Sequence, residues 1–181
     1  MNKIYNCDEE VIIKSNRFKV VCIFMFFTVI ELVMLSNIIY FNIESIVIKF
    51  IIMIASLFIA FGMIVYFIQI FENKPLLIIN KNGFTDNSTL LSLGFISWEE
   101  VIELYEKSDY INELKNIHFI AVRLKDINKL LNTVSKIKSK LIRSNLDTIL
   151  ISVVTSTYKD QEVLEIMQYY FDSYKEKQMI N

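Results

Sequence analysis

The sequence predicts an α+β protein in which an N-terminal transmembrane helical hairpin precedes a soluble domain with an antiparallel sheet and two helices. Three observations predict this fold class. Two long apolar runs lie within residues 18–71, and short β-type runs separated by turn residues follow them. Two segments with helical periodicity come late in the chain. Strands grouped ahead of helices indicate an α+β fold with an antiparallel sheet.

Composition divides the chain into three parts. Of its 181 residues, 54% are hydrophobic and only 22% are charged, and the apolar excess is concentrated in residues 18–71. We expect a cytosolic segment over 1–17, a transmembrane hairpin over 18–71 and a cytosolic domain over 72–181. The net charge of −1 gives no electrostatic reason to expect a nucleic-acid partner.

The two apolar runs extend over about residues 18–41 and 46–71. A helix needs about 20 apolar residues to cross the hydrocarbon core of a bilayer, so both runs are long enough. A cleaved signal peptide is a poor interpretation of the first run, which is too long, carries Glu31 and lacks a small-residue cleavage site.

The basic residues that flank the hairpin predict its orientation. The connector over 42–45 has no Lys or Arg, whereas cations lie on the other side of both spans. They are Lys14, Arg17, Lys19, Lys74 and Lys81. Because such residues stay on the cytoplasmic side, we expect a multi-pass protein of the inner (cytoplasmic) membrane with both termini cytoplasmic and the lipid bilayer as its first partner.

Glu31 is an acidic residue near the middle of the first predicted span. A charge there costs about 2.5–3.5 kcal/mol on insertion scales. If residue 20 lies level with residue 71, Glu31 lies level with Ala60, and Ser56 is close enough to offer a hydroxyl. Two interpretations follow: a protonated acid bonded to a neighbouring hydroxyl or carbonyl, or an oligomer contact or proton-coupled group.

Short strands are predicted after Pro75, which ends the second helix. Asn82-Gly83 predicts a hairpin turn, because both residues tolerate positive φ. The expected strands are Leu76–Asn80, Phe84–Thr85, Leu90–Leu93, Phe95–Trp98, Val101–Glu106, Ile117–Leu124 and Thr148–Val154.

Apolar residues at helical spacing predict helices over Asp126–Arg143 and Asp160–Lys177. Thr157 and Asp160 have the spacing of a capping box at the start of the second.

A basic stripe opposite the apolar face of the first predicted helix is the candidate surface for lipid or a partner. Its members are Lys125, Lys129, Lys136, Lys140 and Arg143. Beside an anionic membrane each would contribute about 1 kcal/mol. The alternative is an ordinary solvated helix face. The stripe lacks interleaved aromatic residues, which disfavours nucleic acid.

The stretch PLLIINKNGFTDNSTLLSLGFISWEEVIELYE carries a resemblance. Its matching positions are Leu76, Leu77, Ile79, Gly83, Asp86, Ser88, Gly94, Ile96, Trp98 and Glu100. It resembles a family of small bacterial membrane proteins with two N-terminal helices. The surroundings of Trp98 are also similar to bacterial pleckstrin-homology-like (PH-like) domains, in which such a strand packs on a curved sheet closed by a C-terminal helix. The resemblance implies an architecture and no biochemical activity.

Catalytic and metal-binding patterns are not found in the sequence. His118 is the only histidine, the two cysteines Cys7 and Cys22 are not expected to pair, and only three glycines are present. Zinc sites need several His or Cys ligands, and phosphate loops need a glycine-rich motif. We expect no enzyme, no metal and no cofactor.

The leading functional hypothesis is a membrane-anchored, non-enzymatic binding module that engages a protein partner or anionic lipid through its cytosolic PH-like domain. One alternative is a bacterial immunity protein that neutralises a toxin at the membrane. Another is an oligomeric component of an ion path that uses Glu31, which would require a homo-oligomer because two helices cannot enclose a pore.

Overall fold

The computed structural model describes residues 7–40, 45–72, 74–89, 92–111, 115–132, 139–140 and 147–180, with backbone alone for 39–40, 108–111, 115–118 and 180. The chain forms two compact units. We call them the sheet domain, formed by Met1–Ser15 with Lys74–Asn181, and the hairpin, Asn16–Asn73.

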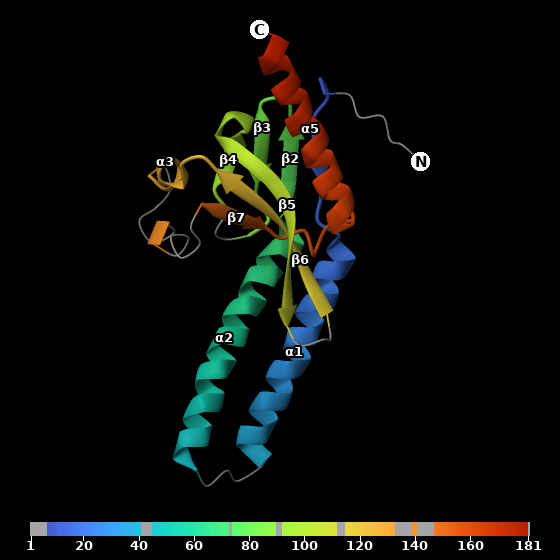
Figure 1. Cartoon of the computed structure of the whole chain (residues 1–181). Coiled ribbons are helices and arrows are strands. Elements are labelled where there is room, and N and C mark those ends of the chain that lie inside the picture. The colour runs from blue at the N-terminus through green and yellow to red at the C-terminus, as the bar shows by residue number, and fades with distance from the viewer. Residues whose placement is uncertain are drawn as a thin grey trace. The chain divides into compact units, whose positions relative to one another are not determined.

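The hairpin consists of α1 (Arg17–Tyr40) and α2 (Ile46–Phe71) (Figure 1). Asn16 caps α1, because its Oδ1 accepts hydrogen bonds from the N–H groups of Phe18 and Lys19 at 3.0 and 3.3 Å. At 1.5 Å per residue the two helices are about 36 and 39 Å long. Both are therefore long enough to span a membrane.

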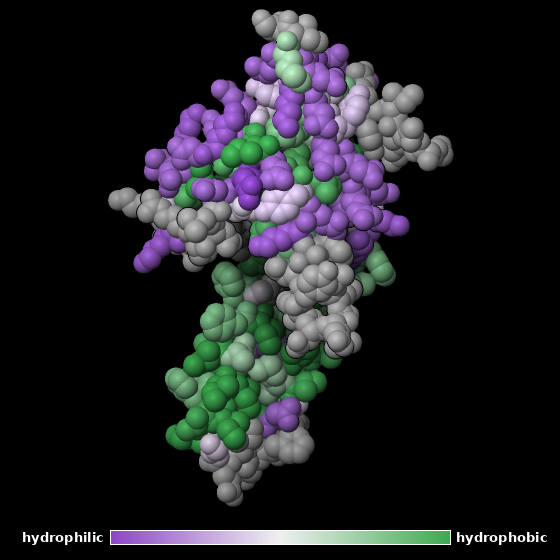
Figure 2. All heavy atoms as spheres, in the orientation of Figure 1, coloured by the Kyte–Doolittle hydropathy of each residue, from purple (hydrophilic) through white to green (hydrophobic). Residues whose placement is uncertain are grey.

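The hairpin surface is apolar and exposed. In the most apolar window of each helix, only 6% of α1 and 0% of α2 is buried, whereas the core helix of a soluble protein is mostly buried. Figure 2 shows the hairpin as mostly hydrophobic and the sheet domain as mostly hydrophilic. Two helices of this length and composition can span a bilayer.

Aromatic side chains set the register between the two helices. The ring centroids of Phe24 and Phe67 lie 6.0 Å apart, and those of Phe27 and Tyr66 lie 5.9 Å apart. These pairs agree with the predicted register, in which residue 20 lies level with residue 71.

The first sheet has four antiparallel strands in the order β1-β2-β3-β4. Its strands are β1 (Val11–Ile13), β2 (Leu77–Asn80), β3 (Gly83–Asp86) and β4 (Gly94–Ser97). β1 precedes the hairpin in the chain and β2 follows it, with Ile13 opposite Leu77. The sequence pattern predicts no strand before the hairpin, because three residues are too few to show a period.

The β2–β3 hairpin forms, although its turn chemistry differs from the prediction. The loop is Lys81-Asn82, and the expected positive φ at Asn82 and Gly83 is wrong, since neither residue adopts it. Gly83 is instead required by close packing: a Cβ there would lie 2.2 Å from the carbonyl oxygen of Ile96. Gly94, at the start of β4, does adopt a positive φ, of 77°.

The second sheet has three antiparallel strands in the order β5-β6-β7. They are β5 (Val101–Ile111), β6 (Lys115–Leu124) and β7 (Thr148–Ile151), and the 3₁₀ turn η1 (Trp98–Glu100) connects β4 to β5. The architecture is therefore α+β, with its strands divided between two sheets.

Three predicted elements are corrected. The prediction of a strand over Leu90–Leu93 is wrong at Ser92 and Leu93, which do not belong to a strand. Leu90 and Leu91 lie outside the described residues. The strand predicted to end at Val154 ends at Ile151. Within the helix predicted over Asp126–Arg143, α3 (Ile127–Leu131) and residues 139–140 are helical, but Asn132 lies in a turn that ends α3. Residues 133–138 and 141–146 lie outside the described residues.

The last helix, α5 (Asp160–Ile180), begins where the sequence predicts but is capped differently. Glu162 Oε2 accepts a hydrogen bond from the backbone N–H of Lys159 at 3.0 Å. The capping box at Thr157 and Asp160 is therefore wrong, because Thr157 lies too far from the first helical residue.

Side chains from both sheets, α3 and α5 meet in one core. Its largest fully buried members include Ile13, Phe84, Trp98, Ile120, Ile151, Ile166 and Tyr170. The packing of α5 on β2, β5 and β6 joins the two sheets.

The N-terminal segment packs along α5. The Tyr170 hydroxyl donates to the carbonyl of Glu9 at 2.8 Å, and the Cys7 thiol donates to Ser173 at 3.0 Å. A hydrogen bond with Cys7 also raises the pKa of Tyr169. Both cysteines are free thiols.

Truncation of Ile13 tests whether β1 is an integral part of the core. Ile13 is 0% exposed and its neighbour Ile12 is 45% exposed. We expect Ile13→Ala to lower the free energy of unfolding of the sheet domain by about 2–5 kcal/mol, because it leaves a cavity. The fluorescence of Trp98, the single tryptophan, would follow unfolding of the full chain in detergent micelles. Equal effects of Ile12→Ala and Ile13→Ala would contradict the assignment.

Candidate functional site

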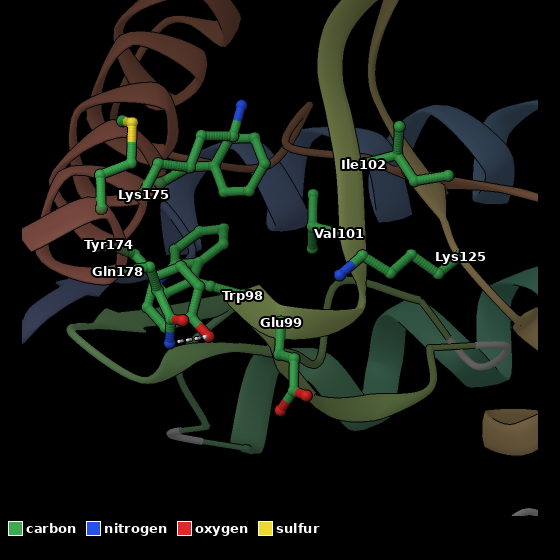
Figure 3. A pocket seen from close by; sticks show the side chains of 10 residues that line it. Trp98, Glu99, Val101, Ile102, Lys125, Tyr174, Lys175 and Gln178 are labelled. Carbon is green, nitrogen blue, oxygen red and sulfur yellow. Dashed lines mark hydrogen bonds between the residues drawn. The ribbon is translucent and has the colours of Figure 1, made fainter. Parts of the chain in front are cut away.

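A groove of about 700 Å³ lies between the start of β5 and the second half of α5. Trp98 and Val101 line it from the sheet side, and Tyr174 lines it from α5 (Figure 3). Phe171 on α5 lines it as well. It lies wholly within the sheet domain. We call it the α5 groove.

Trp98 forms the floor of the α5 groove and is fixed by contacts on several sides. Its indole Nε1 donates to the carbonyl of Asn80 at 2.9 Å, and its backbone N–H donates to that of Asn82 at 3.1 Å. Its ring centroid lies 5.2 Å from that of Phe84 and 5.8 Å from that of Phe171. These contacts join the β2–β3 hairpin to α5 and make the floor rigid.

The walls of the α5 groove expose apolar side chains. Ile102 on β5 is 47% exposed and Met179 on α5 is 78% exposed. Both line the groove. Exposed apolar walls beside an aromatic floor provide a surface that gains free energy when an apolar group covers it.

Cationic side chains border the same groove. Lys125 extends into it from the side of the sheet, and Lys175 lies on α5 with its Nζ 3.9 Å from the centroid of Phe171 (Figure 3). Beside Lys175, Gln178 Nε2 donates to the Tyr174 hydroxyl at 3.1 Å. Glu99 contributes a carboxylate to the rim.

The predicted basic stripe does not form one continuous helix face over the described residues. Lys125 precedes α3 and lines the α5 groove, whereas Lys129 lies on α3 and pairs with Glu100. Lys140 is exposed. Lys136 and Arg143 lie outside the described residues.

The ion pair of Lys129 with Glu100 has a clear electrostatic effect. A hydrogen bond to Glu100, followed by its negative charge, raises the pKa of Lys129 above the ordinary value of 10.5. A raised pKa means that the pair contributes stability below pH 10.5, and that this contribution is lost as the pH rises through the higher folded-state value.

Glu31 lies in the hairpin and accepts a hydrogen bond from the hydroxyl of Ser56 through its Oε1. Ser56 is the hydroxyl partner that the predicted register offered. Glu31 Oε2 is buried and has no hydrogen-bond partner within the described part of the chain. Glu31 also borders a hollow of about 330 Å³ lined by Ala60, Met63 and aromatic side chains.

Most positions that carry the family resemblance have structural roles. The backbone N–H of Ser88 donates to Asp86 Oδ1 at 2.8 Å, which closes a buried turn after β3. Gly83 has no room for a Cβ and Gly94 adopts a positive φ, while Ile96 and Trp98 are buried. These positions explain the fold of the first sheet without requiring any chemistry.

Catalytic and metal-binding chemistry has no assembled site among the residues that the structure describes. Over those residues, no three His, Cys, Asp or Glu side chains gather as a metal ion would require. His118 lies in β6, and its side chain is outside the described ones.

Comparison with known proteins gives no relative: no family model, curated protein or solved structure matches the chain.

Of the residues that line the α5 groove, only Lys125 belongs to the basic stripe predicted from the sequence as a candidate binding surface. Ile102 and Met179 carry no pattern that separates an exposed apolar residue from a core one. Glu99 is exposed on the rim of the groove. The groove forms because the second half of α5 lies beside the start of β5, about 70 residues earlier in the chain. A contact between such distant segments leaves no pattern in the local sequence.

Neutralising Glu100 tests the cause of the raised pKa of Lys129. We expect Glu100→Gln to lower that pKa toward 10.5, because it removes both the hydrogen bond and the negative charge. NMR titration of labelled lysines would measure it. Glu103→Gln is the matched control, since Glu103 pairs with Arg123 at 3.2 Å. An unchanged value in Glu100→Gln would contradict the assignment.

A double-mutant cycle tests the hydrogen bond between Ser56 and Glu31. We expect Ser56→Ala and Glu31→Ala to show a coupling energy of about 0.6 kcal/mol in α1–α2 association, typical of interhelical hydrogen bonds in membranes. Energy transfer between one dye on each helix, followed in rising SDS, would measure it. Ser36→Ala is the control, because Ser36 bonds the carbonyl of Val33 in its own helix. A coupling energy of zero would rule the bond out.

Proposed function

We propose that the chain is a membrane-anchored, non-enzymatic binding module. In this proposal α1 and α2 span the inner membrane, and the sheet domain, of PH-like type, lies on the cytoplasmic side. The α5 groove is its binding surface, and its ligand is an anionic partner with an apolar part. The observation that carries the proposal is the combination of exposed Ile102 and Met179 with Lys125 and Lys175 around one groove.

The lengths and exposed apolar surfaces of α1 and α2 support the membrane anchor. In water this surface would be strongly unfavourable, whereas lipid solvates it. The helices also satisfy their own backbone hydrogen bonds, as a spanning segment must.

The pairing of β1 with β2 supports a topology with both ends of the hairpin on one side of the membrane. β1 precedes α1 and β2 follows α2, and two strands can pair only in the same compartment. The basic residues near these ends support the cytoplasmic side.

The arrangement of the sheet domain agrees with the PH-like resemblance. Its strands form antiparallel sheets, and α5 follows them in the chain and packs against β2, β5 and β6. Antiparallel strands followed by a packed C-terminal helix support the PH-like part of the proposal.

Photocrosslinking of the full chain in cells tests the anchor and the groove together. A photoreactive amino acid would replace Met179, and a tag would follow the C-terminus. After irradiation and an alkaline carbonate wash, we expect the tagged chain in the membrane pellet with an adduct at residue 179. Gln161, exposed at the other end of α5, is the control position and should give no adduct.

Release of the chain by carbonate would contradict the anchor. Removal of the tag by protease outside intact cells would contradict the cytoplasmic orientation. Equal adducts at residues 161 and 179, or none at either, would contradict binding in the α5 groove.

A further inference from the structure

The α5 groove has an excess of positive charge. Next to it, a hollow of about 200 Å³ shares Tyr174 and Gln178 with the groove. Among the described residues, four lysines and one glutamate line the two spaces: Lys81, Lys125, Lys175, Lys177 and Glu99. Complementary charge selects partners, so the lining favours a ligand with carboxylates or other anionic groups.

Within the sheet domain, the groove lies away from the points where the chain continues into the hairpin. The chain leaves at Ser15 and returns at Lys74. The bridge between Ser15 and Ser156 places the start of α5 at that end, and α5 then rises about 21 Å over the 14 residues to Tyr174. Trp98 bonds Asn80 and Asn82, which lie at the opposite end of β2.

Within the sheet domain, the groove is therefore distinct from the two chain connections at Ser15 and Lys74. Binding of a lipid instead of a protein is one of the outcomes that the crosslinking experiment distinguishes.

The strand that lines the groove favours an extended peptide. Among the described strands β5 pairs only with β6, so it is an edge strand. The register between β5 and β6 shifts between Val101 and Glu103, next to Ile102. Edge strands present main-chain N–H and C=O groups that an extended segment can pair with.

We infer that the α5 groove binds an extended acidic segment of a partner protein. A bulky apolar side chain of that segment packs between the exposed side chains of Ile102 and Met179, and its carboxylates meet Lys125 and Lys175. This inference rests on the proposed function and narrows its anionic partner to a protein.

Peptide selection on the full chain in nanodiscs tests this inference. Short random peptides displayed on phage would be selected on the wild type and counter-selected on Lys125→Glu/Lys175→Glu. We expect acidic peptides with at least one bulky apolar residue to be enriched. A synthetic copy of an enriched peptide should bind the wild type more weakly as salt rises, and should lose about tenfold or more in affinity with Lys125→Glu or Ile102→Ser.

Two matched controls use exposed positions outside the groove. Lys159→Glu reverses a charge before the start of α5, and Ile12→Ser removes an apolar side chain on β1. Both should leave the affinity of the peptide unchanged. Enrichment of basic or uncharged peptides, no enrichment over the charge-reversed variant, or equal losses in the controls would overturn the inference.

The identity of the Met179 adduct separates failure of this inference from failure of the proposed function. An adduct with an acidic segment of another protein supports both. A lipid adduct overturns the inference and leaves a membrane-anchored module that binds an anion. An adduct with a second copy of the chain overturns the inference as well, and absence of any adduct overturns both.

Discussion

The pairing of β1 with β2 is the constraint on which the rest of the structure depends. These strands lie on either side of the hairpin in sequence, yet Ile13 stands opposite Leu77 and both are fully buried. Joining distant segments has an entropic cost that grows with the intervening chain. The antiparallel packing of α1 on α2, seen in the contact of Phe24 with Phe67, brings the chain ends together and lowers that cost.

Trp98 extends this constraint to the α5 groove. It is held by main-chain carbonyls at the β2–β3 turn, and its ring lies between Phe84 and Phe171. Trp98 is therefore a buried member of the core and also lies at the bottom of the groove. The α5 groove is a direct extension of the core, so its shape is set by the packing that stabilises the fold.

Sequence patterns predicted the hairpin, most strands and the start of α5, because long apolar runs and periodic segments carry those elements. They did not predict β1, whose three residues are shorter than any recognisable period. They predicted a turn at Asn82-Gly83, and the β2–β3 hairpin does form there, but neither residue adopts a positive φ. Glycine is required at position 83 because a Cβ would collide with the carbonyl oxygen of Ile96. Two of the candidate cations lie in different surroundings, which the sequence pattern could not show. Lys125 lines the α5 groove, whereas Lys129 forms an ion pair with Glu100.

The position of β1 also has a consequence for biosynthesis. During translation β1 leaves the ribosome before α1, whereas its partner β2 emerges only after α2. Until then Ile13 has no core to enter, and the edge of β2 does not yet exist. The sheet domain can thus be completed only once the hairpin has been made. Completion of the domain is coupled to synthesis of both helices, and until then β1 has no strand to pair with.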